Sequence, residues 1–383
     1  MNAVTYTMDT EPPFAGLKKS KTIKEIALEA GVSTATVSRV LNNPERVKQT
    51  RRDAVLRVIE RHDYVSHGMA GALAGARSMT IGVVIPTITN SIYAASTQAI
   101  QRVAQREHYG VLLGVSDFEP DEEQRIVRHL IERRVDGLIL TGGGRDPGIY
   151  RVIERHQIPY VVTWRLDAAA KCPCVSFDNY VAGRLAMSHL LELGHSRIGL
   201  ICGRSKVNDR AMERRKAYED ALTERGFIVD QAMIFERDFE FIEGRKAMRR
   251  MLDSPDPPTA LFAANDIQAV GALAECHAAG LNVPGDISIM GFDDLPLAEY
   301  TIPKLTTIRV PGQRMGHIAA SRLMDMINGE ANPQSEVLPV ELILRESTAV
   351  PSKKAIHCKV KLTAAAVTNA DDFSAADAGS RKV

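Results

Sequence analysis

The sequence predicts a small all-α head followed by a larger α/β core of two doubly wound lobes, each built on a parallel sheet. Helical periodicity dominates residues 22–63, and short apolar runs alternate with helical patterns after Thr80. A run of small residues at 65–78 separates these two regions. Continuous Val, Ile and Leu runs between helices are typical of parallel strands that are covered on both faces.

Charge and composition narrow the class of protein. The hydrophobic content of 45% and charged content of 25% are typical of a globular protein, and 383 residues suffice for two or three domains. The formal net charge is only +1, yet residues 18–77 hold 12 Lys or Arg against 6 Asp or Glu. A basic head on a near-neutral remainder favours nucleic-acid phosphate contacts made by the head alone.

Targeting signals and cysteine use favour the cytoplasm. The first 16 residues lack the basic start and apolar run of a signal peptide, and no apolar run is long enough to span a membrane. Five scattered cysteines fit a reducing compartment. Cys172 and Cys174 form the one close pair, and they are interpreted as structural because no second pair or His cluster accompanies them. Neither a metal nor a cofactor is expected.

Residues 22–42 (TIKEIALEAGVSTATVSRVLN) contain two short helical patterns that flank a glycine. Gly31 lies where the chain must turn, and glycine adopts a left-handed backbone at the lowest cost. Ser33 is suited to cap the second helix. The exposed face of that helix is predicted to carry Thr34, Ala35, Thr36, Ser38 and Arg39. This is the pattern of a helix-turn-helix, whose second helix enters the major groove of DNA. An ordinary helical hairpin is the alternative.

A third helix is predicted from about Thr50, with Val55, Val58 and Ile59 facing inward. The predicted domain order is a disordered leader, a DNA-binding head, a hinge, a core and a disordered tail. These domains are placed at residues 1–20, 21–64, 65–78, 79–350 and 351–383. Few apolar anchors in the leader, and Ala, Asp, Ser and Lys in the tail, indicate disorder.

The core contains seven apolar runs that predict strands, at 81–86, 109–115, 136–142, 158–164, 197–203, 258–265 and 286–294. They predict two lobes, at about 80–163 and 164–305. Ligands of such folds bind beyond the carboxyl ends of the strands. Several of these ends carry polar or aromatic side chains, which suits a binding cleft.

Taken together, these segments closely resemble the LacI family of ligand-responsive transcription regulators. The likeness covers about residues 22–350 and includes the helix-turn-helix, VDGLIL, FDNYVAGRLAMSHLLELGHSRIGLICG, ANDIQAVGAL and DISIMGFDD. The resemblance implies a homodimer, with a tetramer as the larger alternative, that binds a near-palindromic operator in double-stranded DNA. It also implies that each core closes on a small-molecule effector, as a periplasmic-binding-protein-like domain does. No leucine heptad follows Val350, which disfavours a zipper-type tetramer.

The resemblance assigns DNA contacts to the second helix and to the hinge. Thr34 and Ala35 fall where the family reads bases, followed by Thr36, Ser38 and Arg39 on the same face. Arg39 is long enough to reach a guanine edge, and a phosphate contact is the alternative. Asn42 is expected to contact the DNA backbone.

Leu73 matches the hinge leucine that wedges into the minor groove in this family. Packing of Leu73 against the core is the alternative. The sequence departs from the family pattern at Ser66-His67 and at Gly71, and a glycine inside a helix costs about 1 kcal/mol relative to alanine. The hinge helix is therefore expected to form only on DNA, and less readily than is usual.

The effector-binding positions of the family fall on Tyr93, Trp164, Arg214, Phe239, Asn265 and Asp293. Arg, Asn and Asp can bind the vicinal hydroxyls of a carbohydrate, and an aromatic ring can stack on its apolar face. Each of three residues has an alternative role. Trp164 could belong to the hydrophobic core, and Asp293 could cap the following helix. Arg214 could be part of a solvated run of positive charge. That charge makes an anionic sugar or a sugar acid a reasonable effector.

An enzyme and a periplasmic solute-binding protein are the two alternative classes for this sequence. An enzyme is disfavoured because no phosphate-binding loop, nucleophile elbow or metal-ligand spacing is present. The glycine run at 142–144 is interpreted as a flexible loop at the rim of the cleft. A periplasmic solute-binding protein fits the two lobes but neither the helix-turn-helix nor the N-terminus. Within the regulators, a repressor is favoured over an activator or a co-repressor-dependent regulator.

Overall fold

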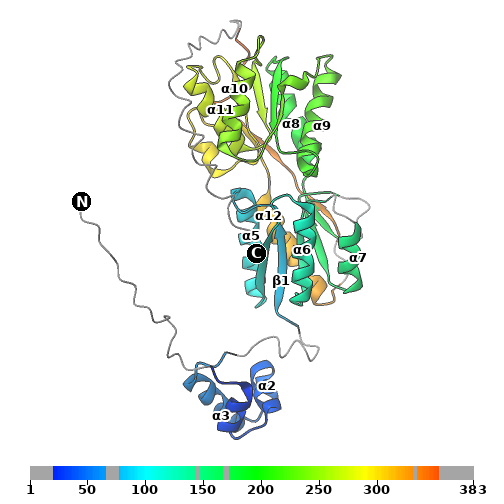
Figure 1. The fold of residues 1–383 in the computed structure, drawn as a ribbon, viewed down its shortest axis with the longest axis vertical. Coiled ribbons are helices and arrows are strands. Elements are labelled where there is room, and N and C mark those ends of the chain that lie inside the picture. The colour runs from blue at the N-terminus through cyan, green and yellow to red at the C-terminus, as the bar shows by residue number, and fades with distance from the viewer. Residues whose placement is uncertain (1–19, 66–76, 144–146, 167–171, 331–333, 353–383) are drawn as a thin grey trace, which may run out of the picture. The chain divides into compact units, whose positions relative to one another are not determined.

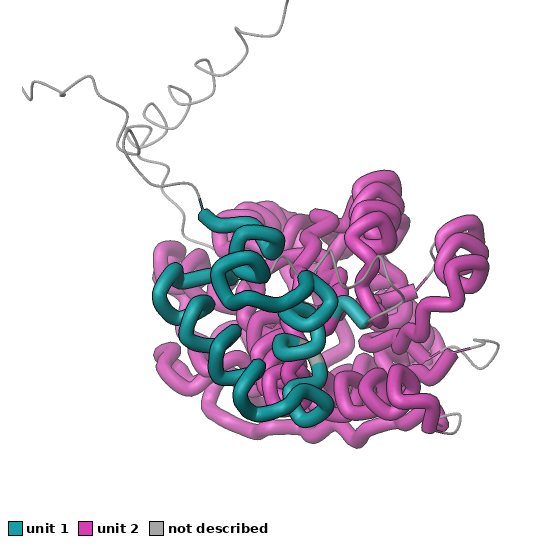
Figure 2. The backbone as a smooth tube through the Cα atoms, turned by 90° about the horizontal axis from the view of Figure 1, so that it is seen from below, with its two compact units in different colours: residues 1–78 teal, residues 79–383 magenta. Residues whose placement is uncertain are grey.

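The computed structural model describes residues 20–65, 77–143, 147–166, 172–330 and 334–352. The chain divides into two compact units, one ending at Ser78 and one beginning at Met79 (Figure 2). The first unit contains the head and the second contains the core.

The head is a three-helix fold, as predicted. Its helices are α1 (Ile23–Glu29), α2 (Thr34–Asn42) and α3 (Gln49–Arg61), with a short 3₁₀ helix, η1 (Pro44–Arg46), before α3. Thr22 and Glu25 form a reciprocal capping box at the start of α1. Gly31 has a φ of +65° at the turn, and Ser33 Oγ accepts a hydrogen bond of 3.2 Å from the Thr36 amide.

All three helices contribute to the core of the head. The buried residues are Ile26, Ala27, Val37, Val40, Val55 and Val58. Ile59 is partly buried against them, so the predicted inward face of α3 is confirmed.

The first lobe of the core is a six-stranded parallel sheet with helices on both faces (Figure 1). Its strand order is β11-β5-β4-β3-β1-β2. The strands are β1 (Thr80–Ile85), β2 (Gly110–Val115), β3 (Gly137–Thr141), β4 (Tyr160–Thr163), β5 (Cys174–Ser176) and β11 (Glu336–Val337). The helices are α5 (Ser91–Arg106), α6 (Pro120–Glu132), α7 (Pro147–Arg155) and α12 (Gly312–Ile327). Val83 packs with residues of α5 and α12, whereas its neighbour Val84 packs with residues of α6 and α7. This alternation places the two helix pairs on opposite faces of the sheet.

The second lobe repeats this design on a four-stranded parallel sheet of order β7-β6-β8-β9 (Figure 1). Its strands are β6 (Ile198–Cys202), β7 (Ile234–Glu236), β8 (Ala260–Ala263) and β9 (Ser288–Met290). The helices are α8 (Asn179–Glu192), α9 (Asp209–Glu224), α10 (Phe241–Leu252) and α11 (Asp266–Ala278), with short 3₁₀ helices η2 (Gln231–Met233) and η3 (Pro296–Glu299). Helices α8 and α9 pack on one face of the sheet, and α10 and α11 on the other.

The predicted division of the core at residue 164 is wrong. Strand β5 still belongs to the sheet of the first lobe, and α12 returns to that lobe after the second one is complete. The chain therefore passes between the lobes three times, and β10 (Thr307–Arg309) pairs with β12 (Glu341–Ile343) in an antiparallel ribbon. Each predicted strand is present, whereas β5, β7, β10, β11 and β12, which have only two or three residues each, were not predicted.

Four of the five cysteines lie in the described residues, and Cys172, Cys174, Cys202 and Cys276 are all buried. No helix in the described ranges is long and apolar enough to cross a membrane. Within the same ranges, no group of three His, Cys, Asp or Glu residues is arranged to hold a metal ion.

Candidate DNA-binding surface and effector cavity

The second helix of the head presents the predicted reading residues to solvent. Thr34, Ala35 and Arg39 are exposed, and Thr36 and Ser38 are partly exposed. The Thr36 hydroxyl lies 3.0 Å from Ser33 Oγ, so the start of α2 is held by two side chains as well as by its backbone. Thr34, Ala35 and Arg39 are therefore the most accessible of the five side chains.

Two predicted DNA contacts lie outside what can be described. Asn42 is the last residue of α2, but its side chain is outside the part of the chain that the structure describes. Leu73 falls in the segment 66–76, which is also outside them. Both assignments stay predictions.

A cluster of charges around Glu29 holds the ends of the head together. Glu29 at the end of α1 forms ion pairs with Lys21 and with Arg61 and His62 near the end of α3. The hydrogen bonds from Lys21 and then His62 lower the pKa of Glu29 from 4.5 to about 2. The carboxylate of Glu29 therefore helps to hold α3 against α1.

All six predicted effector residues line one cavity between the two lobes of the core. The lining residues are Asn90, Ile92, Tyr93, Trp164, Phe177, Asn179, Arg210, Arg214, Phe239, Asn265 and Asp293. The cavity has a volume of about 10 Å³, which is near the smallest size that holds one water molecule. A ligand can therefore enter only if the side chains or the lobes move. Larger spaces of about 380 Å³ and 230 Å³ lie beyond Phe239 and Arg210, respectively.

Aromatic rings form one wall of the cavity. The centroid of the Trp164 ring lies 5.0 Å from that of Tyr93 and 6.0 Å from that of Phe177. Trp164 is 3% exposed and has a φ of +69°, and its carbonyl accepts a hydrogen bond of 3.2 Å from Asn179 Nδ2. The core role and the cavity role of Trp164 thus coexist, because the ring packs in the interior and also lines the cavity.

Asn265 and Asp293 are joined to each other on the second lobe. Asn265 Oδ1 caps α11 by accepting from the Ile267 amide at 2.9 Å, and Asn265 Nδ2 donates to Asp293 Oδ2 at 2.5 Å. Burial raises the pKa of Asp293 to about 6, against the opposing effects of Arg214, Asn265 and Asn90. Leu295 is the residue that precedes η3, and no side chain caps that helix. The alternative of Asp293 as a helix cap is therefore excluded.

Arg210 and Arg214 lie one turn apart on α9 and both enter the cavity. They are 5% and 6% exposed, so the run of positive charge around them is not fully solvated. The guanidinium of Arg214 lies 4.4 Å from the centroid of the Phe292 ring, and its Nη1 is 4.0 Å from Asp293 Oδ1. The predicted set of effector residues did not include Arg210, which also lines the cavity. Its four-residue spacing from Arg214 was the available signal, because that spacing places both on one helix face.

Polar contacts beside the cavity join the two lobes. Asp209 on α9 accepts hydrogen bonds from the Gly143 amide at 2.9 Å and from Arg165 Nη1 at 3.4 Å. Asn90 and Tyr93 of the first lobe line the same cavity as Asp293 and Arg210 of the second lobe, and they act electrostatically on these two residues.

Arg210 also packs directly on the first lobe, because a Cβ atom added to Gly142 would lie 1.8 Å from its Nη1. Gly142 and Gly143, which were interpreted as part of a flexible rim, are thus in contact with α9 in the second lobe.

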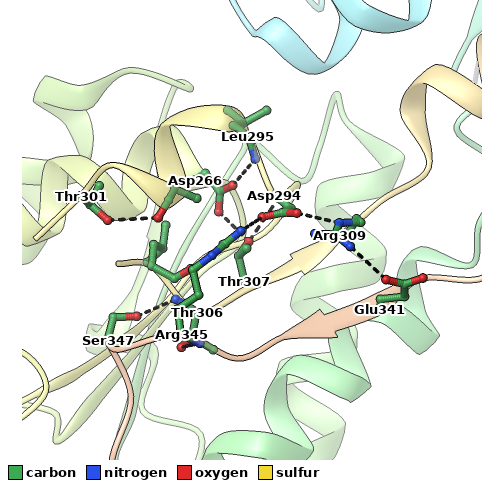
Figure 3. A network of polar contacts seen from close by, with 12 residues as sticks. Asp266, Asp294, Leu295, Thr301, Thr306, Thr307, Arg309, Glu341, Arg345 and Ser347 are labelled. Atoms are coloured by element: carbon green, nitrogen blue, oxygen red, sulfur yellow. Dashed lines mark hydrogen bonds and ion pairs between the residues drawn. The ribbon is translucent and has the colours of Figure 1, made fainter. Parts of the chain in front are cut away.

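A network of polar contacts supports the loop that carries Asp293 (Figure 3). Asp266 accepts from the Leu295 amide and from Thr307 Oγ1, both at 2.7 Å. Asp294 accepts from Arg309 Nε and from Arg345 Nη2, also both at 2.7 Å. Burial raises the pKa of Asp266 well above its usual range, with the nearby Asp293 as the second cause. The network ties the loop after β9 to the ribbon between the lobes, so it positions Asp293 without touching the cavity.

A helix-turn-helix head on one chain with two doubly wound lobes defines a DNA-binding regulator with a binding-protein-like core. Residues 22–67 match the bacterial regulatory proteins of the lacI family, and residues 187–348 match a periplasmic binding protein-like domain. The transcriptional repressor CytR of Escherichia coli K12 is 36% identical over 329 residues, which are 85% of this chain and 96% of CytR. Catabolite control protein A of Priestia megaterium is 33% identical over 328 residues, covering 85% and 99%.

Solved structures agree with this assignment. The lac repressor dimer bound to operator and the anti-inducer ONPF aligns with a TM-score of 0.75 and 28% identity, over 86% of this chain and 100% of the other. A complex of the transcriptional regulator CelR with cellobiose aligns with a TM-score of 0.63 and 31% identity, over 85% and 99%. The chain belongs to the LacI family of DNA-binding transcriptional regulators. Its relatives are regulators and not enzymes, and the predicted fold class is confirmed.

Proposed function

We propose that this protein is a cytoplasmic repressor that binds a near-palindromic operator as a homodimer. In this proposal a sugar or sugar acid enters the cavity between the lobes and lowers the affinity for the operator. The reading residues are Thr34, Ala35, Thr36, Ser38, Arg39 and Asn42 on α2, with Leu73 in the hinge. The effector residues are Tyr93, Trp164, Arg214, Phe239, Asn265 and Asp293.

One observation carries this proposal. The six effector residues come from six separate segments of the chain, between Tyr93 and Asp293, and all of them line the same cavity. They combine a guanidinium, a carboxylate and an amide with aromatic rings. This combination suits a ligand with several hydroxyl groups and an apolar face.

The contacts between the lobes suggest how a ligand would act. The side chains of the second lobe meet the first lobe at three points: Asp209 bonds the Gly143 amide, Arg210 packs against Gly142, and Asp293 lies beside Asn90. A ligand that binds these same groups competes for the bonds between the lobes, so its affinity differs between two arrangements of the core. The first lobe begins at β1, directly after the predicted hinge, and its movement would change the spacing of paired heads. A coupling of about 1–3 kcal/mol is typical of such switches.

The proposal is tested by selecting bound sequences from random duplex DNA with the full-length protein. We expect a palindromic site, and we expect a sugar or a sugar acid to weaken binding to it. A ligand that strengthens binding would instead indicate co-repression, and transcription that rises when the site is occupied would indicate an activator. Failure to select any motif, together with tight sugar binding, would support a solute-binding protein instead.

A further inference from the structure

We propose that the effector carries an anionic group, either a carboxylate or a phosphate, and that this group binds between Arg210 and Arg214. The inference rests on the proposed function, because it concerns the ligand of the same cavity. It assigns a specificity-determining role to Arg210. It also excludes neutral sugars as the preferred ligands.

The first support is the placement of two guanidinium groups in one enclosed cavity. Arg210 and Arg214 lie on the same face of α9, and each is more than nine-tenths buried. A buried guanidinium stays charged, and removing it from water costs free energy unless a counter-charge and hydrogen bonds compensate it. The contacts of each guanidinium therefore indicate what a ligand must supply.

The second support is the balance of charge around the cavity. Arg210 and Arg214 are opposed by one lining carboxylate, Asp293, whose pKa burial raises to about 6. Asp209 contacts Arg210 at 2.9 Å from outside the cavity, but the same carboxylate also accepts from Arg165. Among the residues that line the cavity, two guanidiniums therefore face one carboxylate, which is an excess of one positive charge. Glu213 and Glu123 act electrostatically on Arg214 and Arg210, respectively, from outside the lining.

Arg214 is the less compensated of the two guanidiniums. Its Nε donates to the Arg210 carbonyl at 3.3 Å, and Asp293 lies at 4.0 Å, beyond direct hydrogen-bond distance. Burial lowers the pKa of Arg214, and its contact with the ring of Phe292 replaces only part of the lost hydration. An anionic group beside Arg214 would restore the missing counter-charge.

The third support is a pair of buried polar atoms without partners. Arg210 Nε and Asn179 Oδ1 have no hydrogen-bond partner among the residues that the structure describes, and both residues line the cavity. The first atom needs an acceptor and the second needs a donor. A carboxylate or phosphate oxygen supplies the acceptor, and a hydroxyl on the same molecule supplies the donor. Together, Arg210 Nε and Asn179 Oδ1 favour a ligand that carries both an acidic group and a hydroxyl group.

The first experiment uses small anions on the full-length protein. Acetate, inorganic phosphate and chloride are compared at equal ionic strength by the thermal unfolding of the core, which is followed by the fluorescence of Trp164, the only tryptophan. A ligand that binds only the folded state raises the unfolding temperature. We expect acetate or phosphate to stabilise the wild type more than chloride does, and the stronger of the two identifies the class of acid.

Variants of α9 separate this site from general effects of salt. Arg210→Gln should remove the difference between the anions, and Arg210→Lys should keep part of it, because the charge remains while the planar fork is lost. Arg215→Gln is the matched control. Arg215 is on the same helix, but it bonds Glu219 and Glu236 outside the cavity. If Arg210→Gln does not fold, Arg210→Lys decides the comparison.

The second experiment titrates matched neutral and acidic ligands. D-glucose and D-galactose are compared with their aldonates, uronates and 6-phosphates by the fluorescence of Trp164. We expect the tightest ligand to be an acid that binds at least about tenfold more tightly than its neutral partner, and Arg210→Gln should remove that preference. If no acid binds, the response of wild type and Arg210→Gln to acetate and phosphate decides the question.

The inference is overturned if a neutral sugar binds most tightly and Arg210→Gln leaves its affinity unchanged. It is also overturned if acetate and phosphate act equally on the wild type and on Arg210→Gln. In the first case the proposed function survives, provided that the neutral sugar changes operator binding. If acids bind the cavity but operator affinity never responds, the anion site stands and the proposed control of DNA binding fails.

Discussion

The head and the effector cavity form their functional surfaces in opposite ways. The head presents its reading residues from one short helix, and Thr34 and Arg39 are five positions apart in the sequence and exposed. The cavity gathers residues from Asn90 to Asp293, and nearly every polar side chain in it is buried. A change to an exposed reading residue of the head should therefore alter DNA binding without altering stability, whereas a change in the cavity should alter both ligand binding and stability.

The largest effect is expected from Asp293→Ala. This substitution leaves Asn265 Nδ2 without its acceptor and leaves Arg214 without its nearest carboxylate. The response of DNA binding to the effector should be abolished, and the free energy of unfolding of the core should fall by about 1–3 kcal/mol. Operator affinity without ligand should stay within about twofold. A ligand response equal to that of the wild type would show that Asp293 is not needed for effector binding.

A smaller loss is expected from Leu73→Ala in the hinge. The role of Leu73 follows from the family resemblance, and a wedge that kinks DNA adds contact surface at the cost of unstacking a base step. Operator affinity should fall by about one to two orders of magnitude. The contacts that the kink adds must repay an unstacking cost of a few kcal/mol, and these contacts are lost together with the wedge. The affinity for the effector, measured by the fluorescence of Trp164, should not change. Equal operator affinity in both proteins would remove the wedge from the account.

The head was predictable because its determinants are local. Gly31 at the turn, the Ser33 cap and the inward apolar positions of α3 can all be recognised within about 40 residues. The long strands of the core were also predictable, since buried parallel strands are continuous apolar runs. The division of the lobes was not, because α12 returns to the first lobe and β5 is three residues long.

The cavity was predictable only through the family resemblance, and only in part. No local pattern shows that Asn90 and Asn179 lie beside Asp293, because these residues belong to segments that are far apart in the sequence and meet only in the folded core. Arg210 appears in a run of charges that is normally solvated. Its burial depends on Gly142 and Tyr93 in the first lobe, which no pattern within α9 can reveal.

Arg39→Ala tests the exposed side of the comparison. The substitution should weaken binding by about 1–3 kcal/mol if Arg39 reads a base, while the unfolding temperature stays constant because Arg39 is exposed. Affinities for operators altered at single positions provide the measurement. Loss of discrimination at one position supports base reading, and a uniform loss supports a phosphate contact. Arg128→Ala is the control, since Arg128 is an exposed residue of α6 in the core.

The smallest effect is a difference in pH dependence between the head and the core. The folded pKa of Glu29 is about 2, below the ordinary 4.5, so its contribution is present above pH 4.5 and is lost as the pH falls towards 2. The folded pKa of Asp293 is about 6, above the ordinary 3.8, so its contribution is present below pH 3.8 and is lost as the pH rises through 6.

Between pH 3 and pH 6, the contribution of Glu29 to the stability of the head should therefore rise with pH, and the contribution of Asp293 to the stability of the core should fall. Amide hydrogen exchange, corrected for its intrinsic pH dependence, measures both units in the intact protein. Glu29→Gln should flatten the response of α2, and Asp293→Asn that of α11. A response that neither variant changes would assign the effect to other groups.

The central claim is that the cavity and the head are coupled. The most direct test measures the affinity of the full-length protein for its selected operator, with and without a saturating acidic sugar that binds the cavity. We predict that the ligand weakens operator binding by about 5- to 150-fold, which is the range of typical coupling, and that Asp293→Ala removes the effect. Equal operator affinity with the cavity filled and with it empty would contradict the account.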